Sequence, residues 1–100
     1  MAGYFTPKEP QVKVVITVVG KDRVGIIAGV SNALAEKSVN ILDISQTILQ
    51  DYFTMIMLAE LDPERISIAD LAETLNATGA KIGVQIRVQH EAIFEAMHRV

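Results

Sequence analysis

The sequence predicts an α+β sandwich in which four strands and two helices follow the order β-α-β-β-α-β. Two observations carry this prediction: apolar residues alternate with other residues in some segments and recur at helical spacing in the segments between them. Half of the 100 residues are hydrophobic, which fills one core but not two. We therefore expect a single domain over residues 12–100, preceded by a flexible tail over residues 1–11, where two of the three prolines lie.

The first strand and the first helix are expected directly after this tail. Valine and isoleucine recur at alternate positions from Val12 to Val18, which is typical of a strand covered on one face, and Gly20 ends the strand. The Asp22 carboxylate can cap a helix by accepting backbone N–H bonds, and apolar residues at helical spacing follow it. We predict a helix that begins after Asp22 and ends near Ser38.

The middle of the chain predicts a β-hairpin. Residues 40–49 and residues 52–61 are both rich in isoleucine, leucine, methionine, phenylalanine and threonine, which favour strands. Only Gln50 and Asp51 separate the two segments. A two-residue connection of this kind joins antiparallel strands.

The second helix and the fourth strand complete the pattern. Ser67 with Asp70 three residues later resembles a capping box, so we expect the helix to begin there, and Gly79 is expected to close it as a left-handed cap. Apolar residues alternate cleanly over residues 82–88 and predict the last strand. A short amphipathic helix is expected over residues 91–100. It should dock on the sheet or on a second copy through an apolar stripe made of Ile93, Ala96, Met97 and Val100.

This element order constrains the topology. Right-handed crossover connections put both long helices on the same face of one antiparallel sheet, as in ferredoxin-like folds. In the usual strand order of that fold, 4-1-3-2, the strand over residues 40–49 lies at an edge. The fold alone does not give the function, because unrelated activities share it.

Composition removes several classes of function. Without cysteine the chain has no disulfide, thiolate zinc site or cysteine nucleophile, and we expect a cytoplasmic protein. The net charge of −3 argues against direct nucleic-acid binding, and no segment approaches the roughly 20 apolar residues that cross a membrane. The two histidines, His90 and His98, lack a third ligand, so neither a metal nor another cofactor is expected. No catalytic grouping is evident, and we expect no enzyme activity.

The loop between the first strand and the first helix is the richest local signal. It runs from Gly20 through Asp22, Arg23 and Val24 to Gly25. The start of a helix presents unpaired N–H groups that suit a carboxylate or phosphate, Gly25 allows close approach to the backbone, and Arg23 adds charge. The two glycines could equally serve only to shape a tight turn.

Asn40 and Asp43 are further candidate ligand-binding residues. They lie at the start of the second strand, where an amide and a carboxylate can hold the polar groups of a ligand, including an ammonium group. The alternative is that Asn40 stabilises a turn and Asp43 is an ordinary solvated carboxylate.

The chain also resembles the ACT domain, and in particular the small stand-alone ACT proteins. The segments that carry the resemblance are residues 18–27, 38–41, 43–47, 51–55 and 92–97. The resemblance implies a regulatory domain without catalysis that binds an amino acid or another small ligand between paired domains. It further implies that the loop from Gly20 to Gly25 contacts the ligand together with Asn40 of a neighbouring domain. Asp22 departs from the asparagine found in several amino-acid-binding members.

Taken together, these observations favour a sensor that binds a small carboxylate, such as an amino acid, at the interface of a homodimer or higher homo-oligomer. Its partner would be a metabolic enzyme or a regulator. Two alternatives stay open. The chain could be a ligand-free dimerising adaptor that docks through a sheet edge or its final helix. It could also be an acylphosphatase-like enzyme that uses Arg23 and Asn40.

Overall fold

The computed structural model describes residues 11–21 and 24–97, apart from the side chains of Leu49 and Met97. It confirms the predicted element order, including the short C-terminal helix. The elements are β1 (Val12–Lys21), α1 (Ile26–Glu36), β2 (Asn40–Leu49), β3 (Tyr52–Leu61), α2 (Ile68–Ile82), β4 (Val84–His90) and α3 (Glu91–Met97).

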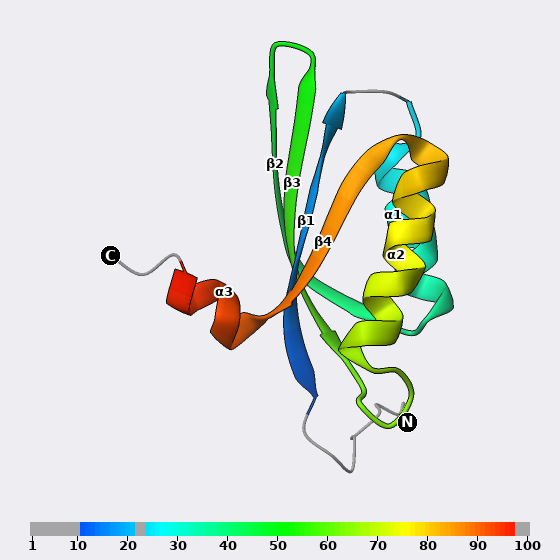
Figure 1. Cartoon of the computed structure of the whole chain (residues 1–100), viewed down its shortest axis with the longest axis vertical. Helices are drawn as coiled ribbons and strands as arrows, with labels where there is room; N and C mark the ends of the chain where they lie inside the picture. The colour runs from blue at the N-terminus through cyan, green and yellow to red at the C-terminus, as the bar shows by residue number, and fades with distance from the viewer. Residues whose placement is uncertain (1–10, 22–23, 98–100) are drawn as a thin grey trace, which may run out of the picture.

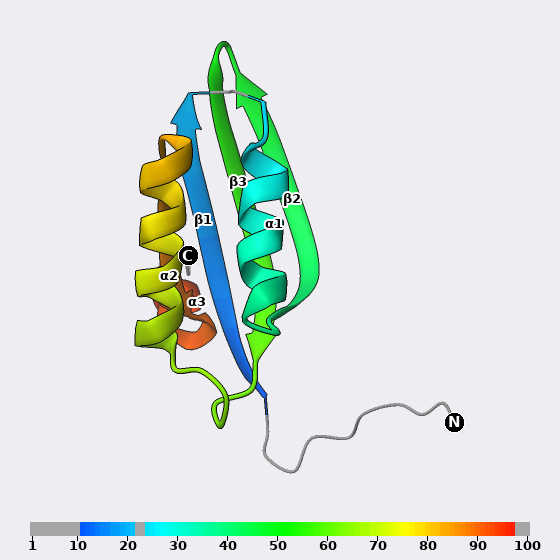
Figure 2. The same cartoon turned by 90° about the vertical axis from the view of Figure 1, so that its right-hand side faces the viewer.

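The four strands form one antiparallel sheet in the order β2-β3-β1-β4, which is the predicted order. Strands β2 and β4 are therefore its two edges. Helices α1 and α2 lie together on one face of the sheet, while α3 lies on the other face (Figures 1 and 2). Seen from the helix side, α1 covers the β2–β3 half of the sheet and α2 covers the β1–β4 half (Figure 2).

The core lies between the sheet and the two long helices. In the central strand β1, the alternate residues Val14, Ile16 and Val18 are fully buried, as their spacing predicted. They meet Leu34 of α1 and Leu75 of α2 in one hydrophobic cluster. Among the described residues, the buried side chains include no polar or charged one, so burial of apolar surface provides the main stabilisation of this layer.

Two local predictions are confirmed at the level of single residues. Strands β2 and β3 are joined by Gln50 and Asp51, and Gln50 adopts a positive φ of 59°, which a tight turn requires. The Ser67 hydroxyl accepts a hydrogen bond of 3.0 Å from the backbone N–H of Asp70 and caps the start of α2.

The start of α1 and the end of α2 differ from the prediction. The N-cap of α1 is Gly25, without a side-chain hydrogen bond, and the helix begins later than a cap at Asp22 implies. The C-cap of α2 is Gly83, with a φ of 90°, rather than Gly79. Gly79 lies inside the helix, where a Cβ would come within 2.6 Å of the Val84 carbonyl oxygen, so packing against β4 accounts for this glycine. Ile82 and Gly83 therefore belong to the helix and its cap, and β4 begins at Val84.

The last helix docks on the chain's own sheet, but the predicted apolar stripe does not face the sheet at Ile93. Helix α3 contacts β1 and β4 on the face opposite the long helices (Figure 1). Val15, which belongs to that face of β1, is only 5% exposed. Ile93, which belongs to the predicted apolar stripe, is instead 55% exposed, and the partly buried residues among Glu91–Ala96 are Glu91 and Phe94. Helix α3 starts where the His90 ring Nδ1 accepts a 3.0 Å hydrogen bond from the backbone N–H of Ala92.

Candidate functional site

The described residues of the loop from Gly20 to Gly25 lie at the end of the sheet where β1 stops (Figure 1). Gly20 pairs with Phe53 of β3 and with Val84 of β4. A Cβ on Gly20 would lie 2.7 Å from a methyl group of Val84, so this glycine is needed for packing at the strand end. Asp22 and Arg23 lie outside the described residues.

Gly25 combines a special backbone conformation with open space. Its φ is 93°, a value that residues other than glycine rarely adopt. Apart from its own chain neighbours, none of the described residues has an atom within 4 Å of the position of a Cβ. Its neighbour Val24 is fully exposed. No side chain at the N-cap accepts a hydrogen bond from the backbone N–H groups in the first turn of α1. These donors can therefore bind an anionic group.

Asn40 and Asp43 lie far from Gly20 and Gly25 within one chain. Asn40 pairs with Glu60 at the end of the sheet where β1 begins, level with Lys13, whereas Gly20 lies at the other end. Seven residues of extended strand separate these levels, about 23 Å. Asp43 pairs with Leu58 on the face opposite the long helices, and its Oδ1 accepts a 2.9 Å hydrogen bond from the backbone N–H of Ile44. One copy therefore does not bring the loop, Asn40 and Asp43 together.

Exposed apolar side chains lie along the β2 edge and at the start of the neighbouring helix α1. We call this set the β2–α1 surface, and its members are Val24, Ile27, Leu42, Ile44 and Ile48. Ile44 and Ile48 pair with residues of β3 that belong to the core, which places both on the helix side of the sheet. Both remain more than 40% exposed because no further strand follows β2.

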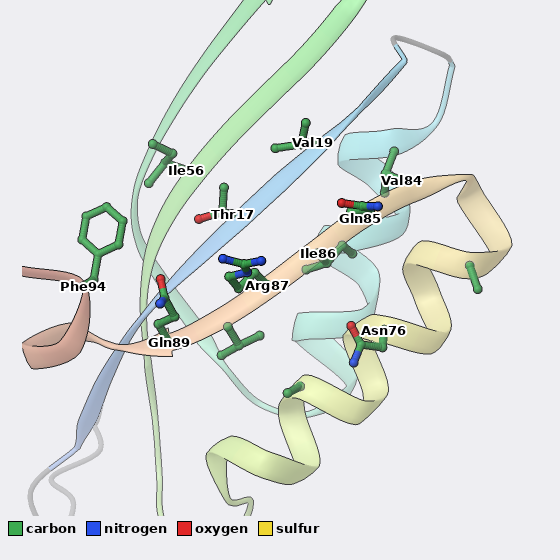
Figure 3. Close-up of a pocket in the computed structure, with 13 residues that line it drawn as sticks. Thr17, Val19, Ile56, Asn76, Val84, Gln85, Ile86, Arg87, Gln89 and Phe94 are labelled. Atoms are coloured by element: carbon green, nitrogen blue, oxygen red, sulfur yellow. The ribbon is translucent and has the colours of Figure 1, made fainter. Parts of the chain in front are cut away.

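A second feature was missed by the sequence analysis. A hollow of about 1040 Å³ lies astride β4 at the other edge of the sheet (Figure 3). Its lining includes Arg87, the single charged residue among the described residues that line it, and Phe94 of α3. The signals were present, because the predicted strand order made β4 an edge and alanines recur eight residues apart in α2.

The described part of the chain contains neither a candidate metal site nor a membrane-spanning helix. Residues 11–21 and 24–97 hold no group of three or more histidine, aspartate or glutamate side chains arranged to bind a metal ion. Within the same residues, no helix has both the length and the apolar character needed to span a bilayer. The histidine at position 90 caps α3, as described above.

Comparison with known proteins gives matches over most of the chain. The family model described as ACT domain matches residues 13–89. A UPF0237 protein of Clostridium acetobutylicum is 57% identical over 88 residues, which is 88% of this chain and 99% of that protein. The solved structure of an ACT domain protein from Streptococcus pneumoniae is 46% identical, with a TM-score of 0.75 over 89% of this chain and 100% of that one. The regulatory subunit of aspartate kinase from Thermus thermophilus is 25% identical, with a TM-score of 0.62, over 79% of this chain and 51% of that one.

Proposed function

Because the chain belongs to the ACT domain family, whose members are regulatory ligand-binding domains, we propose that it senses a small carboxylate metabolite, most simply an amino acid. The ligand binds between two copies of the chain and changes how the pair engages a metabolic enzyme or a regulator. The family is regulatory rather than catalytic, and the proposal includes no chemical step.

The observation that carries the proposal is the β2–α1 surface. Strand β2 is an unpaired edge, and edge strands readily pair with another chain. Its exposed leucine and isoleucines, together with Val24 and Ile27 of the neighbouring helix end, are apolar enough to be buried on association. A two-fold axis through two antiparallel β2 strands would extend the sheet and bury both copies of this surface.

Antiparallel pairing also explains how distant residues could form one site. In that arrangement the Asn40 end of one β2 lies beside the Leu49 end of the other. The Leu49 end is the end of the sheet at which Gly25 begins α1 (Figure 1). The ligand carboxylate would accept the N–H groups of the first turn of α1, and the Asn40 amide of the second copy would hold its polar head. Asn40 and Asp43 both pair with β3 residues on the face opposite the long helices, so the contacts of both side chains with the ligand stay predictions.

Calorimetric titration with the amino acids and related metabolites tests ligand binding. Asn40→Ala should lower affinity by about five- to 150-fold, since it removes a desolvated hydrogen-bonding partner worth about 1 to 3 kcal/mol. Gly25→Asn should also weaken binding, because asparagine tolerates a left-handed backbone while filling the open space. Gly83→Asn is the matched control, with a similar φ of 90° at the end of α2. Binding that neither site variant changes would place the ligand elsewhere.

Cross-linking tests the interface itself. The chain has no cysteine, so a variant with Val24→Cys and Asn40→Cys can react only at the two introduced thiols. Both residues are exposed and lie at opposite ends of the sheet in one copy. A short bis-maleimide should therefore join two chains, and each single variant should give much less covalent dimer. Equal dimer yields from single and double variants would refute antiparallel β2 pairing.

A ligand-free adaptor is the second candidate. The β2–α1 surface accounts for association without any ligand, and this alone favours it. The titration separates the two functions: a stable dimer that binds none of the metabolites would identify the adaptor.

A further inference from the structure

The hollow at β4 has walls on both faces of an edge strand. On the helix side it is lined by Val84 and Ile86 of β4 and by Ala72 and Ala80 of α2. On the other side Gln85 and Arg87 line it, with Thr17 of β1 beside Arg87 (Figure 3). Successive side chains of β4 thus contribute to opposite flanks, as the alternation of a strand requires.

From this geometry we infer that β4 binds an extended acidic–apolar peptide segment of a partner protein, which adds as a fifth strand. An edge strand offers a row of backbone N–H and C=O groups to such a segment. Pockets on both flanks then select alternate side chains, which is how strand addition gains specificity. β4 spans seven residues, Val84–His90, and α3 follows immediately, so the segment is about seven residues long.

The helix-side flank selects apolar side chains. Residues 72, 76 and 80 lie on one line of α2, and two of them are alanines, which leave room above Ile86 of β4. Ile86 is 8% exposed, so the floor of this flank is apolar. A valine, isoleucine or leucine from the incoming strand fills this space and covers the floor.

The opposite flank selects a carboxylate. Arg87 is exposed at the centre of β4, and no aspartate or glutamate is among the described residues that line the hollow. In the described part of the chain, no carboxylate forms an ion pair with Arg87. Its planar guanidinium suits two parallel hydrogen bonds to a carboxylate. Because side chains alternate, the expected motif is apolar–acidic–apolar.

A second copy of this chain fits the β4 edge poorly. Arg87 is the middle residue of the seven, so two β4 strands paired about their centres would place Arg87 opposite Arg87. Like charges directly opposite each other destabilise a strand pair. The arginine thus disfavours self-association at β4, whereas it favours an acidic segment.

Selection from a random library of displayed seven-residue peptides tests the inference, with the full chain as bait. We expect enriched peptides to share the apolar–acidic–apolar motif. One synthetic peptide is then measured by fluorescence anisotropy. Arg87→Gln should weaken it by about ten- to hundredfold, as expected for a hydrogen bond to a charged group. Ala80→Glu should also weaken it, while Lys81→Gln, which removes a nearby exposed cation outside the lining, should leave affinity within twofold.

Strand addition, unlike other binding modes, requires hydrogen bonds from alternate backbone N–H groups of the peptide. N-methylation of the peptide backbone, one residue at a time, should abolish binding at alternate positions only, because alternate N–H groups point toward β4. Circular dichroism of each protein variant confirms that the fold is retained. Failure to enrich the motif, full affinity of Arg87→Gln, or an N-methyl scan without a period of two would each overturn the inference.

Discussion

Replacing Gly79 by alanine tests the close approach of α2 to β4. An added Cβ would lie 2.6 Å from the Val84 carbonyl oxygen and 3.3 Å from a side-chain carbon of Ile86. The first contact is with backbone, so relief requires the helix to move away from the strand. Overpacking of this kind costs about 2 to 3 kcal/mol, and the gain in helix propensity from glycine to alanine returns about 1. We expect a net loss of about 1 to 2 kcal/mol.

Gly29→Ala is the matched control in α1. There the added Cβ would lie 2.5 Å from the terminal methyl group of Ile82. Ile82 is only partly buried, so this flexible end can rotate at a cost of about 0.5 to 1.5 kcal/mol. The helix-propensity gain of about 1 kcal/mol offsets that cost, and we expect a change near zero.

Urea unfolding followed by circular dichroism measures both variants. Gly79→Ala should lower the midpoint without changing the m-value, and its melting temperature should fall by about 5 to 15 °C. The stability of Gly29→Ala should stay close to that of the parent chain. Equal losses in both variants, or a stabilised Gly79→Ala, would refute the reasoning that contact with backbone rather than with a side-chain tip decides the outcome.

Three further predictions concern the interface, α3 and the start of α2. Ile44→Asp should give a monomer in light scattering with an unchanged circular dichroism spectrum, because this exposed side chain lies on the β2 edge. A chain that ends at Gln89 should lose about 1 to 2 kcal/mol of stability, since removal of α3 exposes Val15; an unchanged melting temperature would contradict the docking of α3. Ser67→Ala should cost about 1 kcal/mol in urea unfolding, because the Asp70 N–H loses its 3.0 Å partner.

Local patterns in the sequence were sufficient to predict most of the fold. The hairpin is correct to the residue, since the two strands and the connecting Gln50 and Asp51 all carry strong local signals. The end of α2 was misplaced because Ile82 satisfies two periods at once. It lies two residues before Val84, as in a strand, and seven residues after Leu75, as in a helix. Only the contact of Gly79 with Val84 distinguishes a glycine inside the helix from one at its cap.

The candidate site was harder to predict, for a different physical reason. Sequence signals identify which residues have suitable chemistry, such as Gly25 and Asn40, but not which copy of the chain each one serves. The strand register puts these two residues at opposite ends of the sheet, so any site that uses both depends on a second copy. The hollow at β4 was missed because Arg87 looks like an ordinary exposed strand residue until Ala72 and Ala80 are placed beside it.

The two edges of the sheet differ in chemistry, so we expect each edge to bind a different kind of partner. β2 exposes leucine and isoleucine beside a bare helix start, which suits an apolar interface between copies. β4 exposes Arg87, which opposes self-pairing and attracts a carboxylate. The two central strands lie between the edges, so occupation of one does not block the other. The loop that would receive the small ligand begins at Gly20, which has no room for a Cβ against Val84, the first residue of β4. If a bound ligand displaces Gly20, it also displaces Val84 and so changes the affinity of β4 for its segment. Thermodynamic linkage then requires the bound segment to change ligand affinity by the same factor.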